Sequence, residues 1–269
     1  MNELKNYALV TGSSSGIGLA TCCELAKRSY PLLMVSNEEE KLTVEAKNIE
    51  NKYNVKAIPL YSDLSKTDAA QEVFDYCKSN NIIVEILVNN AGIFFFKDIV
   101  DTSPLLIEKI INLHNLTPVK LIQLFSQKII ADNRKGYILN MASISSRMMM
   151  PGIVLYSSTK SFLRCFSRAM RNEVFNKGVS ITTISPGAVA TGLYNLPPRY
   201  LKLGIRLGII FLPEKLARVA VKKMFKRKKE YIPGGFINHL FIFLVSILPE
   251  KLIRSIKKKI DIKIFKKNA

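Results

Sequence analysis

The sequence contains few residues of the kinds that bind metal ions or form disulfides. Among its 269 residues are four cysteines and two histidines. The cysteines are Cys22, Cys23, Cys77 and Cys165. They show no Cys-x-x-Cys spacing and fall in segments of helical periodicity, so we expect reduced packing residues and neither a metal centre nor a disulfide framework. His114 and His239 have no second ligand at metal spacing, and we expect both to be structural.

Long apolar runs are lacking as well. The N-terminal segment MNELKNYALVTG does not pair a basic region with an apolar run of signal-peptide length. No apolar stretch approaches the roughly 18 to 20 residues that a membrane-spanning helix requires. The sequence therefore predicts a cytoplasmic protein.

Acidic residues are scarce near the C-terminus. Residues 199–269 hold 19 Lys or Arg against four acidic residues, whereas everything before them carries only +4 of the formal net charge of +19. The chain thus consists of a nearly neutral main part and a cationic tail.

Short apolar or β-branched runs alternate with longer segments of helical periodicity. The runs are Tyr7–Val10, Leu32–Val35, Val55–Leu60, Ile86–Val88, Tyr137–Leu139, Val179–Ile184 and, near the C-terminus, Glu230–Gly234. This alternation predicts parallel strands joined by right-handed helical crossovers. We expect a single doubly wound α/β domain with a mostly parallel, seven-stranded sheet. Several runs end in polar turns, which in such a sheet would outline one ligand site.

The turn after the first run is rich in glycine. Residues 11–18 read Thr-Gly-Ser-Ser-Ser-Gly-Ile-Gly. Gly12 permits a tight turn, Gly16 lets the backbone approach a pyrophosphate, and Gly18 allows close helix packing. The spacing TGxxxGIG is wider than GxGxxG and resembles that of the short-chain dehydrogenase/reductase family.

A second motif carries the same resemblance. Tyr156 lies thirteen residues after Ser143 and four before Lys160, which resembles the family's Ser followed by Tyr-x-x-x-Lys. On a helix, Tyr156 and Lys160 would share one face. Ketone reduction needs a proton donor at the developing alkoxide, and a nearby ammonium lowers the pKa of tyrosine from its ordinary value of about 10. Ser143 would hydrogen-bond the substrate oxygen.

The resemblance covers about residues 4–193 and implies further site residues on a Rossmann-like domain. Asn112 matches the family asparagine that kinks its helix, which gives a catalytic tetrad of Asn112, Ser143, Tyr156 and Lys160. The implied contacts of a nicotinamide coenzyme are Gly12, Ser14, Ser15, Gly16, Ile17, Gly18, Ser36, Asn37, Asp63, Leu64, Asn90, Ala91, Gly92, Tyr156, Lys160, Pro186, Gly187, Val189 and Thr191. No metal is implied.

The coenzyme preference rests on the end of the second strand. NAD-preferring relatives would place an aspartate there, and NADP-preferring relatives an arginine on the following residue. Here Ser36 and Asn37 depart from both patterns. Because no acid at Ser36 repels a 2′-phosphate, and Lys41 lies nearby, we favour NADP(H) and leave NAD(H) open.

The C-terminal third suggests how the substrate is recognised. We expect the catalytic domain to span residues 1–235, with an apolar lid at about residues 192–212. The apolar residues of this lid suit a lipophilic carbonyl substrate; alternatively, they only pack on the domain. Residues 236–269 form a basic, apolar extension. Its apolar run lies beside eight Lys or Arg. This pattern favours binding of the extension to an anionic surface, the inner face of the membrane. A buried helix, a subunit contact and a solvated face remain alternatives, and nucleic acid is not expected.

These features predict an NAD(P)-dependent oxidoreductase that acts on a 3-oxoacyl, keto-lipid or sterol-like ketone. The family resemblance implies a homodimer or homotetramer. The alternative is a non-catalytic nucleotide-binding scaffold or sensor that docks on membranes through its tail. A scaffold would not need Tyr156 and Lys160 together, which favours the enzyme.

Overall fold

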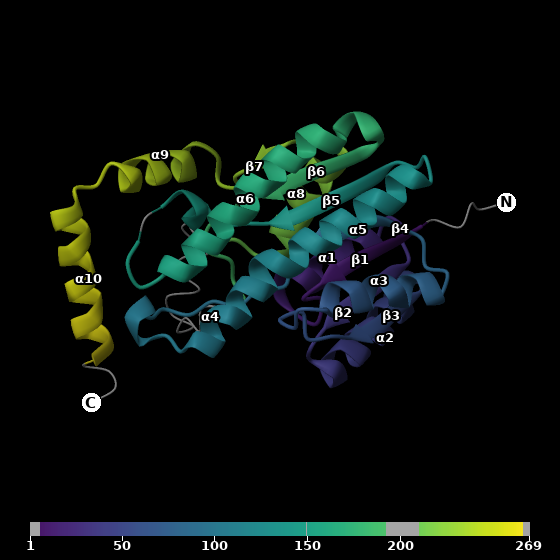
Figure 1. The fold of residues 1–269 in the computed structure, drawn as a ribbon, viewed down its shortest axis with the longest axis horizontal. Coiled ribbons are helices and arrows are strands. Elements are labelled where there is room, and N and C mark those ends of the chain that lie inside the picture. The colour runs from purple at the N-terminus through teal and green to yellow at the C-terminus, as the bar shows by residue number, and fades with distance from the viewer. Residues whose placement is uncertain (1–5, 149, 192–209, 266–269) are drawn as a thin grey trace.

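Seven parallel strands form one sheet at the centre of the fold (Figure 1). The computed structural model describes residues 6–148, 150–191 and 210–265. The strands are β1 (Tyr7–Thr11), β2 (Leu32–Ser36), β3 (Ala57–Tyr61), β4 (Val84–Asn89), β5 (Gly136–Met141), β6 (Val179–Ile184) and β7 (Glu230–Tyr231). Their order is β3-β2-β1-β4-β5-β6-β7, which confirms the predicted doubly wound sheet.

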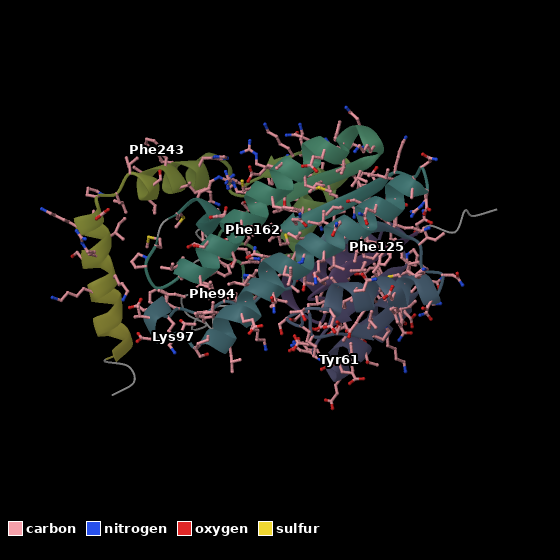
Figure 2. The ribbon with its side chains drawn as sticks, in the orientation of Figure 1. Tyr61, Phe94, Lys97, Phe125, Phe162 and Phe243 are labelled. Atoms are coloured by element: carbon pink, nitrogen blue, oxygen red, sulfur yellow. The ribbon has the colours of Figure 1, made fainter. Side chains whose placement is uncertain are left out.

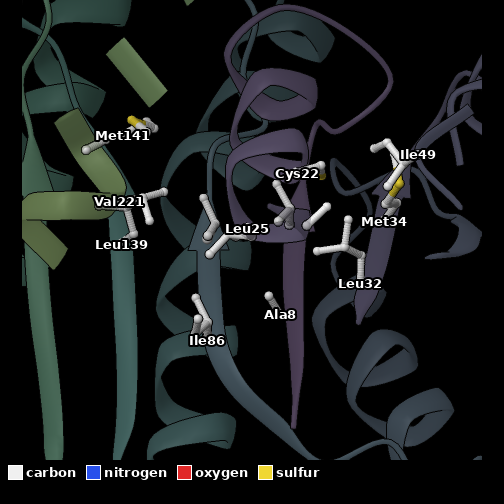
Figure 3. Close-up of a cluster of buried hydrophobic side chains, with 14 of the residues drawn as sticks. Ala8, Cys22, Leu25, Leu32, Met34, Ile49, Ile86, Leu139, Met141 and Val221 are labelled. Carbon is white, nitrogen blue, oxygen red and sulfur yellow. The ribbon is translucent and has the colours of Figure 1, made fainter. Parts of the chain in front are cut away.

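Two apolar layers hold helices on the two faces of this sheet. One layer packs α1 (Gly16–Ala26), α2 (Glu39–Tyr53) and α8 (Pro213–Phe225) on the strands, and Figure 3 shows its side chains. The other packs α3 (Ala69–Ser79), α5 (Thr117–Ala131) and α6 (Val154–Val174) on the opposite face. Strands covered on both sides explain why the predicted runs are almost continuously apolar.

The sheet reverses its direction of growth between β1 and β4. The chain first adds β2 and β3 on one side of β1, then continues with β4 and β5 on the other. The crevice beyond the carboxyl ends of β1 and β4 is the place where such a sheet binds ligands. The glycine motif follows β1, and Ser143 follows β5, the strand next to β4 in the sheet.

One helical region departs from ordinary α-helical geometry. Helix α4 (Pro104–Ile111) begins after the N-cap Ser103, whose hydroxyl accepts a hydrogen bond from Leu106 N at 3.4 Å. A π-helical turn, η2 (Asn112–Leu116), then joins α4 to α5. Single π-turns of this kind shift the faces of the flanking helices relative to each other.

Short 3₁₀ segments complete the connections. They are η1 (Ile99–Asp101), η3 (Ile144–Arg147) and η4 (Phe175–Lys177). The first two follow β4 and β5, so they lie at the same end of the sheet as the predicted site.

The C-terminal extension forms two helices beside the domain, drawn in yellow in Figure 1. They are α9 (Gly235–Ser246) and α10 (Glu250–Phe265). Lys257 of α10 forms an ion pair with Asp98 at 2.6 Å, which ties the extension to the loop after β4. The predicted boundary at residue 235 stays a prediction. Among the helices that the structure describes, none has the length and apolar character needed to span a bilayer.

Candidate active site

The glycine turn between β1 and α1 leaves no room for a side chain at Gly12 or Gly18. Gly12 and Gly16 have φ angles of +63° and +55°, a region that favours glycine. A Cβ on Gly12 would lie 2.8 Å from Ala91 Cα, and one on Gly18 would lie 1.9 Å from Gly12 O. Helix α1 starts at Gly16 with no acidic residue in its first turn, so its free N–H groups favour an anion.

The turn after β4 fixes the glycine turn in place. Thr11 Oγ1 accepts hydrogen bonds from Asn90 N at 2.9 Å and Ala91 N at 3.0 Å. The Asn90 side chain donates to Thr11 O at 3.0 Å and Gly12 O at 3.1 Å. These bonds hold Asn90 and Ala91 against the glycine motif.

A cavity of about 580 Å³ extends along these two turns. Its walls include most of the residues predicted to contact a coenzyme. They are Gly12, Ser14, Ser15, Gly16, Ile17, Ser36, Asn37, Asp63, Leu64, Asn90, Ala91, Gly92 and Thr191. Its volume lies within the range of cofactor sites. The tight turn, the open helix N-terminus and this volume together fit a dinucleotide.

A smaller cavity of about 60 Å³ continues from the first and shares Ile17, Asn90, Gly92, Ile93 and Thr191 with it. Ser143, Tyr156 and Lys160 all line it. Pro186, Gly187 and Val189, predicted at the carboxamide end, line it too. The structure thus brings three of the four predicted catalytic residues to one end of a continuous groove.

Tyr156 and Lys160 lie one turn apart on α6 and are 7% and 5% exposed. The Lys160 ammonium donates a hydrogen bond to Met141 O at 3.0 Å and lies 5.8 Å from the centre of the Tyr156 ring. Burial lowers the pKa of Lys160 from its ordinary value of 10.5 to about 8. The lysine therefore remains a cation at neutral pH, and the positive charge favours the phenolate form of the tyrosine.

Ser143 enters the cavity from the start of η3. It lies two residues after β5 and has an extended backbone, with φ at −161°. Its hydroxyl accepts a hydrogen bond from Ser145 N at 3.2 Å. The hydroxyl proton is thereby left to serve as a donor. Such a donor stabilises negative charge on a substrate oxygen.

The end of β2 contains a carboxylate that the sequence reading missed. Ser14 Oγ donates to Glu38 Oε2 at 2.5 Å, and Ser36 Oγ donates to Ser14 Oγ at 2.9 Å. The Ser14 hydrogen bond, with the neighbouring Lys41, lowers the pKa of Glu38. Glu38 lies two residues beyond Ser36, outside the two positions that were compared with known patterns, so spacing alone did not reveal it.

Asp63 and Leu64 follow β3 in the same cavity. Asp63 Oδ1 accepts hydrogen bonds from Ser65 Oγ at 2.7 Å and Ser65 N at 3.1 Å, which lower the pKa of Asp63. Leu64 is 4% exposed. The ionised side chain of Asp63 and the apolar Leu64 form the polar and apolar walls at the predicted adenine end.

Asn112 does not line the cavity of the other three catalytic residues. Its side chain donates to Ser65 O at 3.0 Å and borders a separate surface hollow. It begins the π-turn η2, where the backbone departs from α-helical geometry. The residue of this turn that meets Tyr156 is His114, whose ring centre lies 5.8 Å from that of Tyr156.

His114 was predicted to be structural because the sequence offers no second ligand at metal spacing. It lies two residues past Asn112, a spacing that in an α-helix points two side chains to different faces. The π-turn contains both residues, and the buried His114 reaches α6, where its Nδ1 lies 3.0 Å from Thr159 Oγ1. Within the described residues no cluster of His, Cys, Asp and Glu could hold a metal ion.

The predicted lid lies mostly outside the described residues. Only Ile210, Phe211 and Leu212 of residues 192–212 are described. Phe211 pairs with Val189 in a parallel bridge, with hydrogen bonds from Ala190 N to Phe211 O at 2.8 Å and from Phe211 N to Ala188 O at 2.9 Å. The end of the predicted lid segment therefore pairs with the segment that lines the small cavity.

The fold and the glycine turn define a doubly wound α/β protein of the dinucleotide-binding class. Comparison with known proteins narrows this class. The family model for short chain dehydrogenase matches residues 6–196. The chain belongs to this family and is an oxidoreductase, as the sequence predicted.

Among its relatives are fatty-acyl enzymes of vertebrates. The chain is 33% identical over 257 residues to the very-long-chain 3-oxoacyl-CoA reductase-B of Danio rerio, covering 94% of this chain and 79% of the zebrafish enzyme. It is 33% identical to the very-long-chain 3-oxoacyl-CoA reductase of Mus musculus, covering 71% of this chain and 62% of the mouse enzyme. The chain therefore spans less than two thirds of the mouse relative.

Solved structures share the fold over most of their length. A short-chain dehydrogenase from Sphingobium yanoikuyae in complex with NADPH superposes with a TM-score of 0.77 at 22% identity, covering 91% of this chain and 97% of that chain. A 7beta-hydroxysteroid dehydrogenase superposes with a TM-score of 0.82 at 25% identity, covering 94% and 96%.

Proposed function

We propose that this chain reduces the 3-oxo group of a long acyl thioester to a 3-hydroxy group, with NADP(H) as coenzyme. The observation that carries the proposal is the placement of Ser143, Tyr156 and Lys160 around one small cavity that opens into a dinucleotide-sized one. The vertebrate relatives, named as very-long-chain 3-oxoacyl-CoA reductases, support the acyl substrate.

In the proposed mechanism, the residues of the glycine turn and of the turns after β2, β3 and β4 hold the coenzyme, which when bound supplies a hydride. Tyr156 donates its phenolic proton to the substrate carbonyl oxygen. Lys160 favours this transfer because its ammonium stabilises the phenolate that remains. Ser143 donates a hydrogen bond to the same oxygen as negative charge grows on it.

The preference for NADP(H) rests on the hydroxyls at the end of β2. Ser14 and Ser36 lie side by side, with no carboxylate at position 36 itself. Their hydroxyl protons, which here point to Glu38 and to Ser14, could instead turn to a phosphate, and Lys41 adds a cation in the same cavity. The negative charge of Glu38 would repel the 2′-phosphate. Its side chain is 50% exposed and paired with Lys41 at 3.5 Å, so it can turn toward solvent.

Apolar side chains around the small cavity support a lipophilic substrate. Ile93, Met141 and Val189 line it. Phe94, labelled in Figure 2, packs edge-on against Tyr156 with ring centres 5.0 Å apart. A sterol-like ketone would also suit such walls, but the acyl reductases match the chain at higher identity than the hydroxysteroid dehydrogenase does.

We also propose that the extension, residues 236–269, docks the enzyme on the inner face of an anionic membrane. Helix α9 exposes Leu240, Phe243 and Leu244, and Ile247 follows it, with exposures of 42% to 59%. Eight Lys or Arg follow in residues 249–267. Apolar side chains beside cations match an interfacial helix, which would bring the site to a membrane-bound acyl substrate.

A homodimer or homotetramer remains part of the proposal. Val154 and Phe162 on α6 are 42% and 49% exposed, so this helix offers an apolar face to a second copy. Light scattering of the purified chain measures the oligomeric state directly.

A substrate panel tests the proposed reaction. Consumption of NADPH should be fastest with long 3-oxoacyl-CoA thioesters, slower with short ones, and slow with steroid ketones. Equal rates for short and long acyl chains, or a preference for the steroid, would contradict the proposed substrate class.

A further inference from the structure

We propose that His114 is a positioning residue of the active site, whose neutral ring holds the Gly92–Ile93 wall of the small cavity to the Tyr156–Lys160 wall. The inference rests on the proposed function, because it concerns the same site. His114 itself does not line the cavity; it lies behind it, 1% exposed.

Three hydrogen bonds form a chain through the ring. Ile93 N donates to His114 Nε2 at 3.0 Å. His114 Nδ1 lies 3.0 Å from Thr159 Oγ1, and that hydroxyl donates to Tyr156 O at 2.9 Å. The two ends of the chain are therefore a residue of one cavity wall and a residue of the other.

The partners fix the tautomer of the ring. A backbone N–H can only donate, so Nε2 must be unprotonated where it meets Ile93. The neutral ring then carries its proton on Nδ1 and donates it to Thr159 Oγ1. The Thr159 hydroxyl can accept this bond because its own proton is directed to Tyr156 O.

Charge and space also require a neutral ring. Burial, together with the nearby Lys160 ammonium, holds the pKa of His114 well below its ordinary value. A Cβ built on Gly92 would lie 2.9 Å from His114 Nε2 and 3.6 Å from Lys160 Nζ. Protonation at Nε2 would break the bond from Ile93 and place a second cation beside this lysine.

The π-turn anchors the ring from its own backbone. Asn115, the next residue, donates from its side chain to His114 O at 3.1 Å and to Thr159 O at 2.9 Å. The turn is thereby joined to α6 through two adjacent residues. Such a connection transmits any displacement of the turn directly to the helix that carries Tyr156 and Lys160.

The Tyr156 ring is held from two sides. Phe94 packs edge-on against it with ring centres 5.0 Å apart, and His114 does so at 5.8 Å. Because Phe94 follows Ile93 in the chain, the Ile93–His114 bond also places Phe94. Loss of the ring should therefore misplace the proton donor more than it weakens coenzyme binding.

Nitrogen NMR of the unmodified, full-length protein tests the predicted state of the ring. The chain has two histidines, and His239, exposed on α9, serves as the internal reference after assignment with His239→Phe. Between pH 5 and 8, roughly the range in which exposed imidazoles titrate, His114 should stay neutral with its proton on Nδ1. Titration of His114 within this range, or a proton on Nε2, would overturn the proposal.

Kinetics test the positioning role. His114→Phe keeps an aromatic ring but loses both hydrogen bonds, and should lower kcat by about 10- to 100-fold, with little change in the KM of the coenzyme. His114→Gln, whose side-chain oxygen can accept a hydrogen bond from Ile93 N, should recover part of the lost kcat. The control His239→Phe should keep the wild-type kcat. Thermal unfolding monitors the fold of each variant.

Wild-type kcat in a folded His114→Phe protein, or no difference between the Gln and Phe variants, would contradict the inference. If His114→Phe does not fold, His114→Gln and the NMR measurement decide the question. Failure of the proposed function itself would be recognised separately, because Tyr156→Phe would then retain turnover.

Discussion

Lys160 combines a catalytic position with an energetic cost. The residue is 5% exposed, and the hydrogen bond from its ammonium to Met141 O replaces only part of the hydration that the ammonium has in the unfolded chain. The lowered pKa expresses this cost, because burial disfavours the charged form. The charge is nevertheless the property that the adjacent tyrosine needs, so function and stability oppose each other at this residue.

This opposition predicts a pH dependence of stability. Folding lowers the pKa of Lys160 from 10.5 to about 8, so between these values the unfolded chain binds the proton more strongly. The free energy of unfolding should then rise with pH across this window, by up to about 3 kcal/mol relative to Lys160→Met. Urea titrations of both proteins at several pH values measure this difference, and a constant difference from pH 8 to 10 would show that Lys160 is not desolvated.

Glu38 gives a second prediction for a single residue. Its carboxylate accepts from Ser14 in the cavity where a 2′-phosphate would bind, so removing its charge should strengthen NADPH binding. Glu38→Gln should lower the Kd of NADPH about 5- to 10-fold, the equivalent of roughly 1 kcal/mol, and leave NADH nearly unchanged.

Glu39→Gln serves as the control, since it removes the same charge from an exposed neighbour. If Glu38→Gln weakens NADPH binding, or strengthens both coenzymes equally, the carboxylate does not face the 2′-phosphate. Fluorescence titration of the bound coenzyme provides these constants.

At the scale of elements, the β1-turn-α1 unit depends on close backbone packing. A Cβ on Gly18 would overlap Gly12 O at 1.9 Å, and backbone cannot rotate away as a side chain can. Gly18→Ala should therefore destabilise the protein by about 3 kcal/mol and weaken coenzyme binding. Gly187→Ala is the matched control, because its nearest neighbours would lie 3.6 Å away; equal stability of the two variants would contradict the packing argument.

Most elements could be predicted because their signals are local. The strands β1, β2, β4, β5 and β6 are runs buried on both faces, and the glycine turn and the Tyr-x-x-x-Lys spacing each lie within one short segment. The π-turn could not be predicted, because helical periodicity assumes 3.6 residues per turn. No pattern in the sequence indicated that His114 would lie against Tyr156 or that Asn112 would bond Ser65 O. Contacts between distant segments, such as Ser14 with Glu38, also lie beyond sequence spacing.

At the scale of the whole molecule, the charge distribution separates a nearly neutral catalytic part from a cationic extension. Each Lys or Arg near an anionic surface contributes about 1 kcal/mol. The full-length protein should therefore float with anionic vesicles, less so at high salt, where screening shortens the reach of each charge. The combined change of Lys251, Arg254 and Lys258 to Glu should reduce binding on the order of 100-fold.

The matched control changes Lys226, Lys228 and Lys229 to Glu, which alters the net charge equally but on exposed residues at the end of α8. Equal flotation of the two charge-changed proteins would show that overall charge, and not the extension, governs binding. No flotation of the unmodified protein would assign the extension to packing or to a subunit contact.

The central claim is that Tyr156 protonates the carbonyl of a long acyl substrate while an adjacent coenzyme is oxidised. Its most direct test compares wild-type protein and Tyr156→Phe in the NADPH-dependent reduction of a long 3-oxoacyl-CoA, with coenzyme binding measured for both. The account predicts one 3-hydroxyacyl product for each NADPH consumed by the wild type, and at least a hundredfold lower kcat in the variant, with an unchanged coenzyme Kd. Wild-type turnover in the folded variant, or no reduction by either protein, would contradict it.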